Sequence, residues 1–291
     1  MEARVLVTSP SVQMPPTAAE LPSEDGEPLE TSWHRSEINL LIESLRVHWQ
    51  GRTDFYVGGN MFIYFSLEQV RRLFYRGPDF FVVLDVDGTR QRESWVVWEE
   101  GGKYPDVIVE LLSPSTARED RTTKKDLYEQ TFRTPNYFCY DPDTQTLEGW
   151  RLRCQKYEPL EPNERGWLWS DQLGLWLGLW QGTYLNEENT WLRFYDTQGV
   201  LVPTFGEAAQ QRAEQERQRA EQERQRARQE RQRARQERQR ARQERQRAEQ
   251  ERQRAEQERQ RAEQERHRAE RAEAELARLR ERLKAQGIEW E

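Results

Sequence analysis

The sequence predicts an α/β (α+β) protein in which a mixed sheet is flanked by helices and followed by a long, charged α-helical heptad-repeat tail. Two short, almost continuous apolar runs, at residues 78–85 and 105–112, are typical of strands that are covered on both faces. The segment before them has apolar residues at helical spacing, and short antiparallel strands are predicted after them. Helices and strands around one sheet give the α/β class.

Composition divides the chain into a core-forming part and a charged part. Apolar residues make up 35 % and charged residues 33 % of the whole, but nearly all aromatic side chains precede residue 206. The formal net charge of −7 gives no global basic signal for nucleic-acid binding. This negative charge is weaker evidence against a metal-dependent nuclease, because a metal ion neutralises its acidic site. Cys139 and Cys154 form neither a disulfide framework nor a zinc site.

No apolar run approaches the length of a membrane span, and the N-terminus lacks the pattern of a signal peptide. We therefore expect a cytoplasmic protein with no membrane partner. Composition and periodicity predict four segments. These are a disordered segment at residues 1–31, a folded domain at 32–205, a charged helical tail at 206–286 and a C-terminal end at 287–291.

The folded domain is expected to begin with a helix through about Trp49. Ser32 or Ser36 can cap it, and Ile38, Leu41 and Leu45 follow helical spacing. Residues 55–65 form either two strands around a tight Gly-Gly turn or a loop and one strand. Ser66 can cap a short helix that reaches residue 75.

The rest of the domain is predicted as strands with one helix between them. After the apolar run at 78–85 come extended segments at 95–98 and 105–112, a helix at 120–132 and a strand at 136–140. Shorter strands follow at residues 147–152, 156–157, 167–169, 173–180, 193–195 and 200–202. The tryptophans between 167 and 191 could stack bases, but tryptophans in such a layer are more often part of the core.

Three residues carry the chemistry that the sequence predicts. Asp79 opens one buried strand, and Glu110 lies inside the next apolar run. A carboxylate among Val, Ile and Leu is costly to bury unless it is paired, protonated or bound to a cation. Lys124 lies on the helix that follows and can reach the end of the strand. From spacing alone a salt bridge is favoured over a catalytic site, because most acid pairs with a nearby lysine are salt bridges.

In the catalytic interpretation, Asp79 and Glu110 bind Mg²⁺ (or Mn²⁺), with the backbone carbonyl of Leu111 as a third ligand. The metal ion lowers the pKa of a bound water and neutralises charge on a phosphate, and the lysine orients the water or stabilises the phosphoryl oxygens. Asp106 is an auxiliary acid on the same face of the strand, although it lies roughly 13 Å from Glu110 along an extended chain.

The segment that contains these residues resembles the Uma-two endonuclease family, which belongs to the PD-(D/E)XK restriction-endonuclease-like superfamily. The resemblance rests on Pro78-Asp79, on Pro105-Asp-Val-Ile-Val-Glu-Leu-Leu-Ser-Pro-Ser-Thr116, and on Asp120, Lys124 and Tyr128 at intervals of four. It covers about residues 50–205. The strand that ends at Asp141-Pro142 completes the pattern.

The resemblance implies a restriction-endonuclease-like fold and a metal-dependent nuclease that acts on DNA. The superfamily places a lysine two residues after the Glu, where this chain has Leu112; in this family the lysine moves to the helix, which selects Lys124 over Lys125. Asp120 and Tyr128 are auxiliary site residues, as is Ser113. A glycine that is usual in the family is replaced here by Arg133, and we expect only packing to change.

The other polar residues carry weaker signals. Ser113 and Ser115 lack the His or Lys partner of a nucleophile and fit a turn or a helix cap better. Tyr128 could hold the Lys124 ammonium or serve as a core tyrosine. His34, His48 and His267 have no metal-ligand partner in the sequence. Either Glu37 or Glu43 could add an acid from the first helix.

The tail repeats the unit Gln-Arg-Ala-Glu-Gln-Glu-Arg from residue 207 to about 285. Its seam offers only alanine, so a lone helix held by Glu–Arg pairs is favoured over a weak coiled coil. If it is helical throughout, it spans roughly 120 Å. Leu276, Leu279 and Leu283 form a short apolar stripe through which the tail can bind itself or another protein.

The sequence therefore predicts a Mg²⁺-dependent phosphodiesterase with DNA as its partner. A homodimer is compatible with this, because nucleases of the superfamily often cut two strands as pairs. Two alternatives stand beside it. One is a nucleic-acid-binding or regulatory module that keeps the fold without catalysis, and the other is a scaffold protein that acts through the helical tail.

Overall fold

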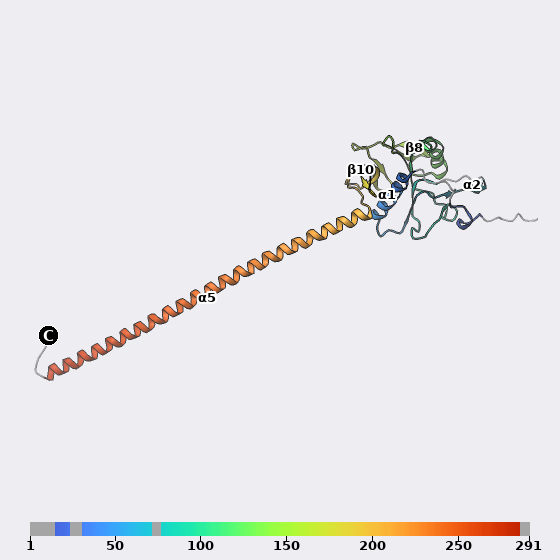
Figure 1. Ribbon diagram of the computed structural model, residues 1–291. Coiled ribbons are helices and arrows are strands. Elements are labelled where there is room, and N and C mark those ends of the chain that lie inside the picture. The colour runs from blue at the N-terminus through green and yellow to red at the C-terminus, as the bar shows by residue number, and fades with distance from the viewer. Residues whose placement is uncertain (1–14, 24–30, 72–76, 286–291) are drawn as a thin grey trace, which may run out of the picture. The chain divides into compact units, whose positions relative to one another are not determined.

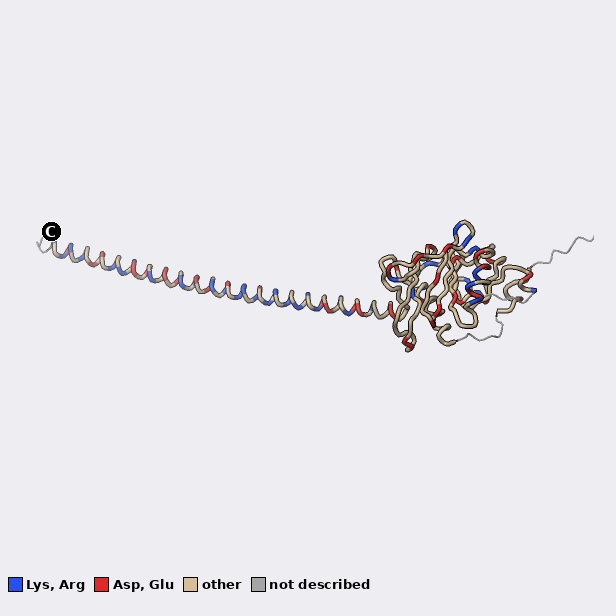
Figure 2. The backbone as a smooth tube through the Cα atoms, turned by 90° about the horizontal axis from the view of Figure 1, so that it is seen from above, with Lys and Arg blue, Asp and Glu red and all other residues tan. Residues whose placement is uncertain are grey.

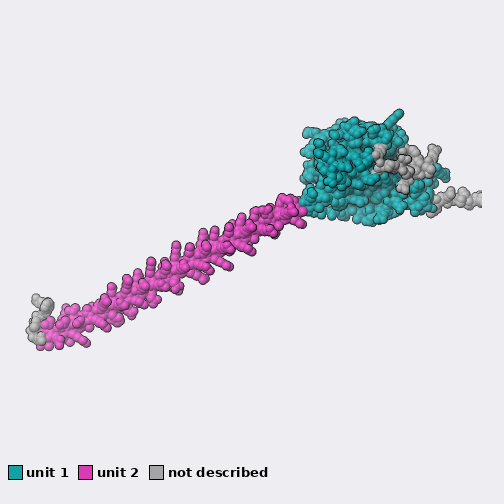
Figure 3. All heavy atoms as spheres, viewed as in Figure 1, with its two compact units in different colours: residues 1–212 teal, residues 213–291 magenta. Residues whose placement is uncertain are grey.

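The computed structural model describes residues 15–23, 31–71 and 77–285 (Figure 1). The chain divides into two compact units, residues 1–212 and 213–291 (Figure 3). Most of the segment predicted to be disordered, and the C-terminal end at 287–291, lie outside the described residues. Residues 15–23 are ordered, contrary to that expectation: the Tyr64 hydroxyl donates to the Pro22 carbonyl at 2.6 Å, and Leu21 is buried.

A six-stranded mixed sheet forms the centre of the first unit, as predicted. Its strand order is β1-β3-β5-β6-β7-β8. Only β5 and β6 are parallel, and a helical crossover joins them. The strands are β1 (Phe55–Gly58), β3 (Phe80–Leu84), β5 (Val107–Leu111), β6 (Asn136–Asp141), β7 (Thr146–Arg153) and β8 (Lys156–Pro159).

Both faces of this sheet are covered, which explains the continuous apolar runs. Helix α1 (Ser32–His48) contributes Ile38, Leu41 and Leu45 to a core with Phe80 and Val109 on one face. The crossover covers the other face, where its Tyr128 and Phe132 pack with Phe81, Ile108 and Tyr137. The α1 cap is Thr31 rather than Ser32 or Ser36, because the Thr31 hydroxyl accepts from the His34 backbone N–H at 3.3 Å.

The crossover begins earlier than predicted and is not a regular α-helix. Two short α-helical turns, α3 (Ala117–Glu119) and α4 (Lys125–Leu127), alternate with two π-helical turns, η2 (Asp120–Lys124) and η3 (Tyr128–Phe132). π-Helical turns are rare and occur frequently at functional sites. Here they carry Asp120, Lys124 and Tyr128.

The glycine pair at 58–59 does not form a hairpin turn. β1 pairs with β3, whereas β2 (Ile63–Tyr64) pairs in parallel with β4 (Trp95–Val96). Gly59 lies so close to the Asp79 backbone that an added Cβ would be 2.5 Å from the Asp79 carbonyl oxygen. The missing side chain thus lets the chain pass against the start of β3.

Helix α2 (Leu67–Arg71) begins as predicted, with the Ser66 hydroxyl accepting from the Gln69 N–H at 3.1 Å. The predicted continuation of this helix through residues 72–76 lies outside the described residues.

A second sheet, in the order β11-β10-β9, packs into the same core as α1. Its strands are β9 (Leu168–Ser170), β10 (Leu175–Tyr184) and β11 (Glu187–Tyr195). Trp191 is fully buried and the Trp167 ring stacks on Tyr195 at 3.8 Å, which favours the core interpretation of the tryptophans. No strand forms at residues 200–202, where only an isolated bridge joins Leu201 to Tyr195.

Helix α5 (Phe205–Ala285) is one continuous helix, and almost all of its residues are exposed. Its apolar stripe is uncovered: Leu276 is 55 % and Leu279 is 52 % exposed. Within the described residues no helix combines the length and apolar character that a membrane span requires. The two readings of the tail, a lone helix and a coiled coil, and its binding through these leucines remain predictions.

Arg133 ends the crossover in the left-handed backbone region, with φ 54° and ψ 39°. Non-glycine residues are disfavoured there because Cβ approaches the following carbonyl oxygen. The glycine that is usual at this position in the family that the sequence resembles therefore has a conformational reason.

We predict that Arg133→Gly raises the free energy of unfolding by about 0.5–1 kcal/mol in urea titrations. Thr131→Gly, inside the preceding turn η3, should lower it by a similar amount; equal losses for both variants would contradict this explanation.

Candidate active site

Asp79 and Glu110 lie side by side because β3 and β5 are antiparallel. Phe80 pairs with Val109, so the register places Asp79 opposite Glu110, on the face that the crossover covers. The Asp79 backbone N–H donates to Glu110 Oε2 at 3.3 Å. In return, Asp79 Oδ2 accepts from the Leu111 backbone N–H at 2.7 Å. Each acid is thus held by the strand that carries the other.

The crossover brings three side chains to these acids. Lys124 Nζ lies 3.2 Å from Glu110 Oε2 and 2.7 Å from Asp120 Oδ1. The Tyr128 hydroxyl donates to Glu110 Oε1 at 2.8 Å. The side chains of Glu110 and Asp120 are 0 % and 1 % exposed and that of Lys124 is 15 % exposed. Asp79 is partly buried and is the most exposed of the three acids.

The site holds three carboxyl groups and one ammonium, so full ionisation leaves a net charge of −2. Burial raises the pKa of Glu110 to about 8, although Lys124 opposes this, and the Asp79 charge raises it further. Burial also raises the pKa of Asp79 to about 6. For Lys124, burial favours the neutral amine, but the charges of Glu110, Asp120 and Asp79 outweigh it and raise its pKa above the usual value. Lys124 therefore stays protonated at neutral pH, and its positive charge is insufficient for three acids.

His34 contacts the predicted third ligand, which the sequence did not suggest. Its Nε2 lies 3.2 Å from the Leu111 carbonyl oxygen, and its Nδ1 lies 2.9 Å from the Thr31 hydroxyl. A carbonyl accepts, so Nε2 carries the proton in this pair. The only signal in the sequence is that His34 shares the buried face of α1 with Ile38 and Leu41. A carbonyl oxygen has two lone pairs, so this bond leaves one for another partner.

Several predicted auxiliary residues are not joined to this cluster. The Asp106 carboxylate accepts from the Leu84 N–H at 2.7 Å, which fixes it at the opposite end of β5. Ser113 Oγ contacts the Ser115 and Thr116 hydroxyls at 2.9 and 3.0 Å, so it builds the turn before α3. Lys125 lies over the Trp150 ring at 3.9 Å instead of reaching the acids.

The two glutamates of α1 have other partners. Glu37, fully buried, accepts from the Leu192 N–H at 3.1 Å, and burial raises its pKa to about 8. Glu43 accepts from the Tyr184 hydroxyl at 3.2 Å and from the Phe205 N–H at 2.7 Å. Both side chains are thus engaged with β10, β11 and the start of α5 rather than with the acid cluster.

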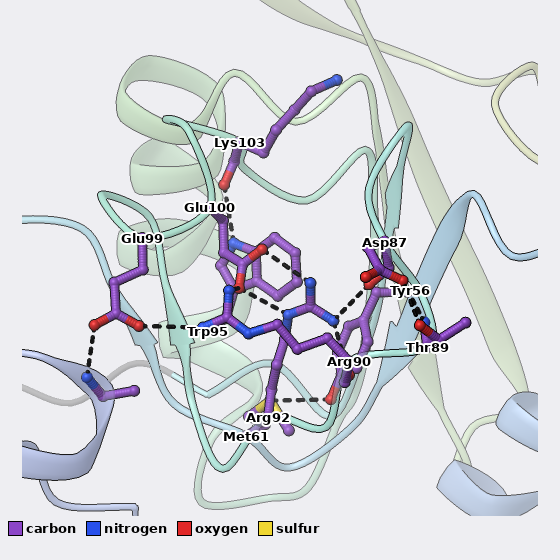
Figure 4. Close-up of polar contacts among 11 residues, drawn as sticks. Tyr56, Met61, Asp87, Thr89, Arg90, Arg92, Trp95, Glu99, Glu100 and Lys103 are labelled. Carbon is purple, nitrogen blue, oxygen red and sulfur yellow. Dashed lines mark hydrogen bonds and ion pairs between the residues drawn. The ribbon is translucent and has the colours of Figure 1, made fainter.

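A cleft of about 940 Å³ lies away from the acid cluster and is lined by four arginines, among them Arg46 and Arg52. Its Arg92 is a structural residue. Figure 4 shows the Arg92 guanidinium against Glu100, which it contacts at 2.8 and 2.9 Å, while Tyr56 and Trp95 flank it at 4.8 and 4.9 Å. The cleft includes no residue of the acid cluster. We place the candidate site at the acids because they, and not the cleft, bring buried carboxylates together with an ammonium.

The donor set at the acid cluster fits a hard divalent cation. Asp79 and Glu110 supply carboxylate oxygens beside the Leu111 carbonyl, and Mg²⁺ commonly binds through one or two carboxylates while keeping several waters. In residues 15–23, 31–71 and 77–285, no group of three His, Cys, Asp or Glu side chains is arranged to hold a metal ion. A cation here would therefore depend on the backbone oxygen and on water in addition to the two acids.

Both a family model and solved structures match parts of this chain. The sequence matches the family model Uma2, described as "Putative restriction endonuclease", over residues 12–186, more than half of the chain. No curated protein matches the sequence. Among solved structures, the chain is similar to the crystal structure of a "putative nuclease belonging to DUF820" from Anabaena variabilis, at 17 % identity and a TM-score of 0.38. That similarity covers 55 % of this chain and 91 % of the other.

The charge balance of the cluster predicts a pH-dependent effect of removing its ammonium. Glu110 and Asp79 have raised pKa values in the folded protein, so they favour the protonated form there. Their destabilising effect is absent below the unfolded-state pKa and grows as pH rises toward about 8 and about 6. Lys124→Met should therefore cost little at pH 5 and about 3–5 kcal/mol at pH 9, because it leaves buried charges uncompensated.

The measurement is urea unfolding of the full chain in EDTA at several pH values. Lys125→Met is the matched control, since it removes an ammonium that lies on Trp150 and should cost about 0.5–1 kcal/mol at every pH. A pH-independent loss for Lys124→Met would contradict the charge balance described here.

Proposed function

Because the chain belongs to the Uma2 restriction-endonuclease family, we propose that it is a Mg²⁺-dependent endonuclease that hydrolyses DNA phosphodiester bonds. Family membership supports the nuclease class, and Mg²⁺, DNA and the site residues are the content of this proposal. Mn²⁺ is expected to replace Mg²⁺, since both prefer oxygen ligands.

One observation carries the proposal: three acids, of which Glu110 and Asp120 are almost completely buried and Asp79 is partly buried, surround a single ammonium. A structural salt bridge needs no more than one acid for each base, and the desolvation of extra carboxylates is unfavourable. Glu110 and Asp120 are almost completely buried, and Lys124 contacts both. The remaining charge of −2 would be balanced by the +2 charge of one divalent cation. Asp79, the acid nearest to solvent, gives such a cation access to the pair.

In this proposal Asp79, Glu110 and the Leu111 carbonyl hold the metal. When bound, the metal supplies a water of lowered pKa and neutralises charge that develops on the phosphate. Lys124 cannot serve as a base, because its raised pKa keeps it protonated. Its ammonium instead orients the attacking water or stabilises the phosphoryl oxygens.

The neighbouring residues position this group. Asp120 holds the Lys124 ammonium at 2.7 Å, and the Tyr137 hydroxyl fixes the Asp120 carbonyl at 2.8 Å. Tyr128 holds the far oxygen of Glu110, and His34 holds the Leu111 carbonyl. Such supporting contacts keep ligands within the narrow geometry that catalysis requires.

Two rivals make different predictions. A catalytically inactive binding module would bind DNA without cleaving it under any metal condition. A scaffold protein would depend on the tail, so removing residues 213–291 would abolish its role. A nuclease should keep cleaving after that removal, provided that circular dichroism shows the remaining unit to be folded.

Asp79→Asn and Glu110→Gln should each lower Mg²⁺-dependent DNA cleavage at least about 100-fold, because each removes a charged metal ligand. Asp106→Asn is the matched control, since its carboxylate caps the other end of β5, and its rate should stay within about threefold. Plasmid and single-stranded substrates are assayed with Mg²⁺, Mn²⁺ or EDTA, and Mn²⁺ binding is measured by calorimetry. Retained cleavage in either acid variant, or none by the wild type on any DNA, would contradict the proposal.

A further inference from the structure

One face of α5 changes its charge pattern in the middle of the tail. Along an α-helix, residues three and four apart lie next to each other. In the first repeats this face alternates in sign, as in Arg217, Glu221 and Arg224. The alternation returns after Arg245 with Glu249 and continues to the end of the repeats. The Arg266–Glu270 pair, 3.4 Å apart, shows that such neighbours make contact.

Between Arg224 and Arg245 the glutamate of each alternating pair is replaced by arginine. Arg228, Arg235 and Arg242 stand where the flanking heptads have glutamate. The face therefore carries arginine at seven successive positions, which we call the arginine stripe. Figure 2 shows all Lys and Arg positions of α5 in blue. The arginine stripe consists of Arg224, Arg228, Arg231, Arg235, Arg238, Arg242 and Arg245.

The acids of this central segment lie on another face. At 100° per residue, the stripe occupies an arc of about 100°, and Glu230, Glu237 and Glu244 lie outside it, at about 110–150° from its centre. These glutamates are three residues before Arg233, Arg240 and Arg247, and can pair with them instead. The five inner arginines of the stripe have no acid three or four residues away; they are Arg228, Arg231, Arg235, Arg238 and Arg242.

This arrangement is unfavourable for an isolated helix. Like charges three or four residues apart destabilise a helix by about 0.2–0.5 kcal/mol for each pair, whereas the flanking heptads gain similar amounts. The stripe contains six successive pairs of this kind. A sequence pattern that destabilises its own helix without improving packing elsewhere often marks a functional surface. A polyanion would remove the repulsion.

We propose that the arginine stripe binds the phosphate backbone of duplex DNA; this rests on the proposed function for the choice of DNA as the polyanion. The stripe spans about 32 Å, over which one DNA strand presents about nine phosphates. Guanidinium groups suit phosphate because their donors match its oxygens. The contacts are to the backbone, so the tail adds affinity without sequence preference.

Other occupants fit this face less well. A second copy in the same register would bring two stripes together, and the alanine seam buries too little apolar surface to offset their repulsion. A membrane surface requires large apolar residues beside the basic ones. In the segment from Arg224 to Arg245, the residues between the charged positions are only Gln and Ala.

The test uses the full chain in EDTA, so that binding is measured without cleavage. The triple variant Arg228→Glu, Arg235→Glu and Arg242→Glu gives the central heptads the sequence of their neighbours. Arg233→Glu, Arg240→Glu and Arg247→Glu is the matched control, because it makes the same charge change on the other face. Circular dichroism checks that both variants remain helical.

Affinity for a 30-base-pair duplex is measured by fluorescence anisotropy at about 50 and 200 mM salt. Each phosphate contact adds about 0.9 to the slope of log affinity against log salt, so loss of three contacts lowers the slope by about 2.7. The weakening of binding between the two salt concentrations should then be about 40-fold smaller for the stripe variant than for the wild type. The control variant should change this ratio by less than about fivefold.

Three outcomes would overturn the proposal: equal effects of the two triple variants, no effect of either, or competition by anionic lipid vesicles but not by unlabelled duplex. Failure of the nuclease proposal is visible separately. In that case no cleavage occurs with any metal, while stripe-dependent DNA binding in EDTA is still measured.

Discussion

The Lys124 ammonium is the constraint on which the candidate site depends. It lies between Glu110 and Asp120, with Asp79 close enough to influence its pKa. A buried ammonium requires a partner of opposite charge. Two buried acids and one partly buried acid beside a single ammonium leave a deficit of positive charge. Three features hold these side chains together. They are the antiparallel register of β3 and β5, the crossover that carries Lys124, and the backbone hydrogen bonds to Asp79 and Glu110. This deficit of positive charge is the basis of the proposed cation site.

The irregular crossover has a geometric explanation. In an α-helix, residues four apart drift by about 40° around the axis, so Asp120, Lys124 and Tyr128 would spread across two steps. The wider π turns η2 and η3 reduce that drift, because their hydrogen bonds span five residues. The three side chains can then approach the same strand residue, Glu110. The spacing of four in the sequence thus has its reason in a helix that is wider than the α form.

The sequence was sufficient to predict the sheet and the proximity of Asp79, Glu110 and Lys124, but not the residues that support them. Asp79 and Glu110 are recognisable because carboxylates interrupt or border apolar strands, and Lys124 because of the family's spacing. His34 lies 77 residues before Leu111 in the chain, and no local pattern links them. Asp106 has the strand parity of Glu110, yet its carboxylate caps Leu84 at the far end of the sheet, which only strand pairing reveals. The Gly-Gly segment misled for the same reason, since β1 and β2 belong to different sheets.

The central claim is that Asp79, Glu110 and the Leu111 carbonyl share one divalent cation. Crystals of the full chain grown with Mn²⁺ and measured at a wavelength where manganese scatters anomalously test it directly. The account predicts one anomalous peak within about 2.0–2.3 Å of oxygens from all three residues, with waters completing the coordination. A crystal grown at saturating Mn²⁺ that lacks this peak would contradict the claim. Within the described residues, Lys124 would then be the only positive charge beside the acids.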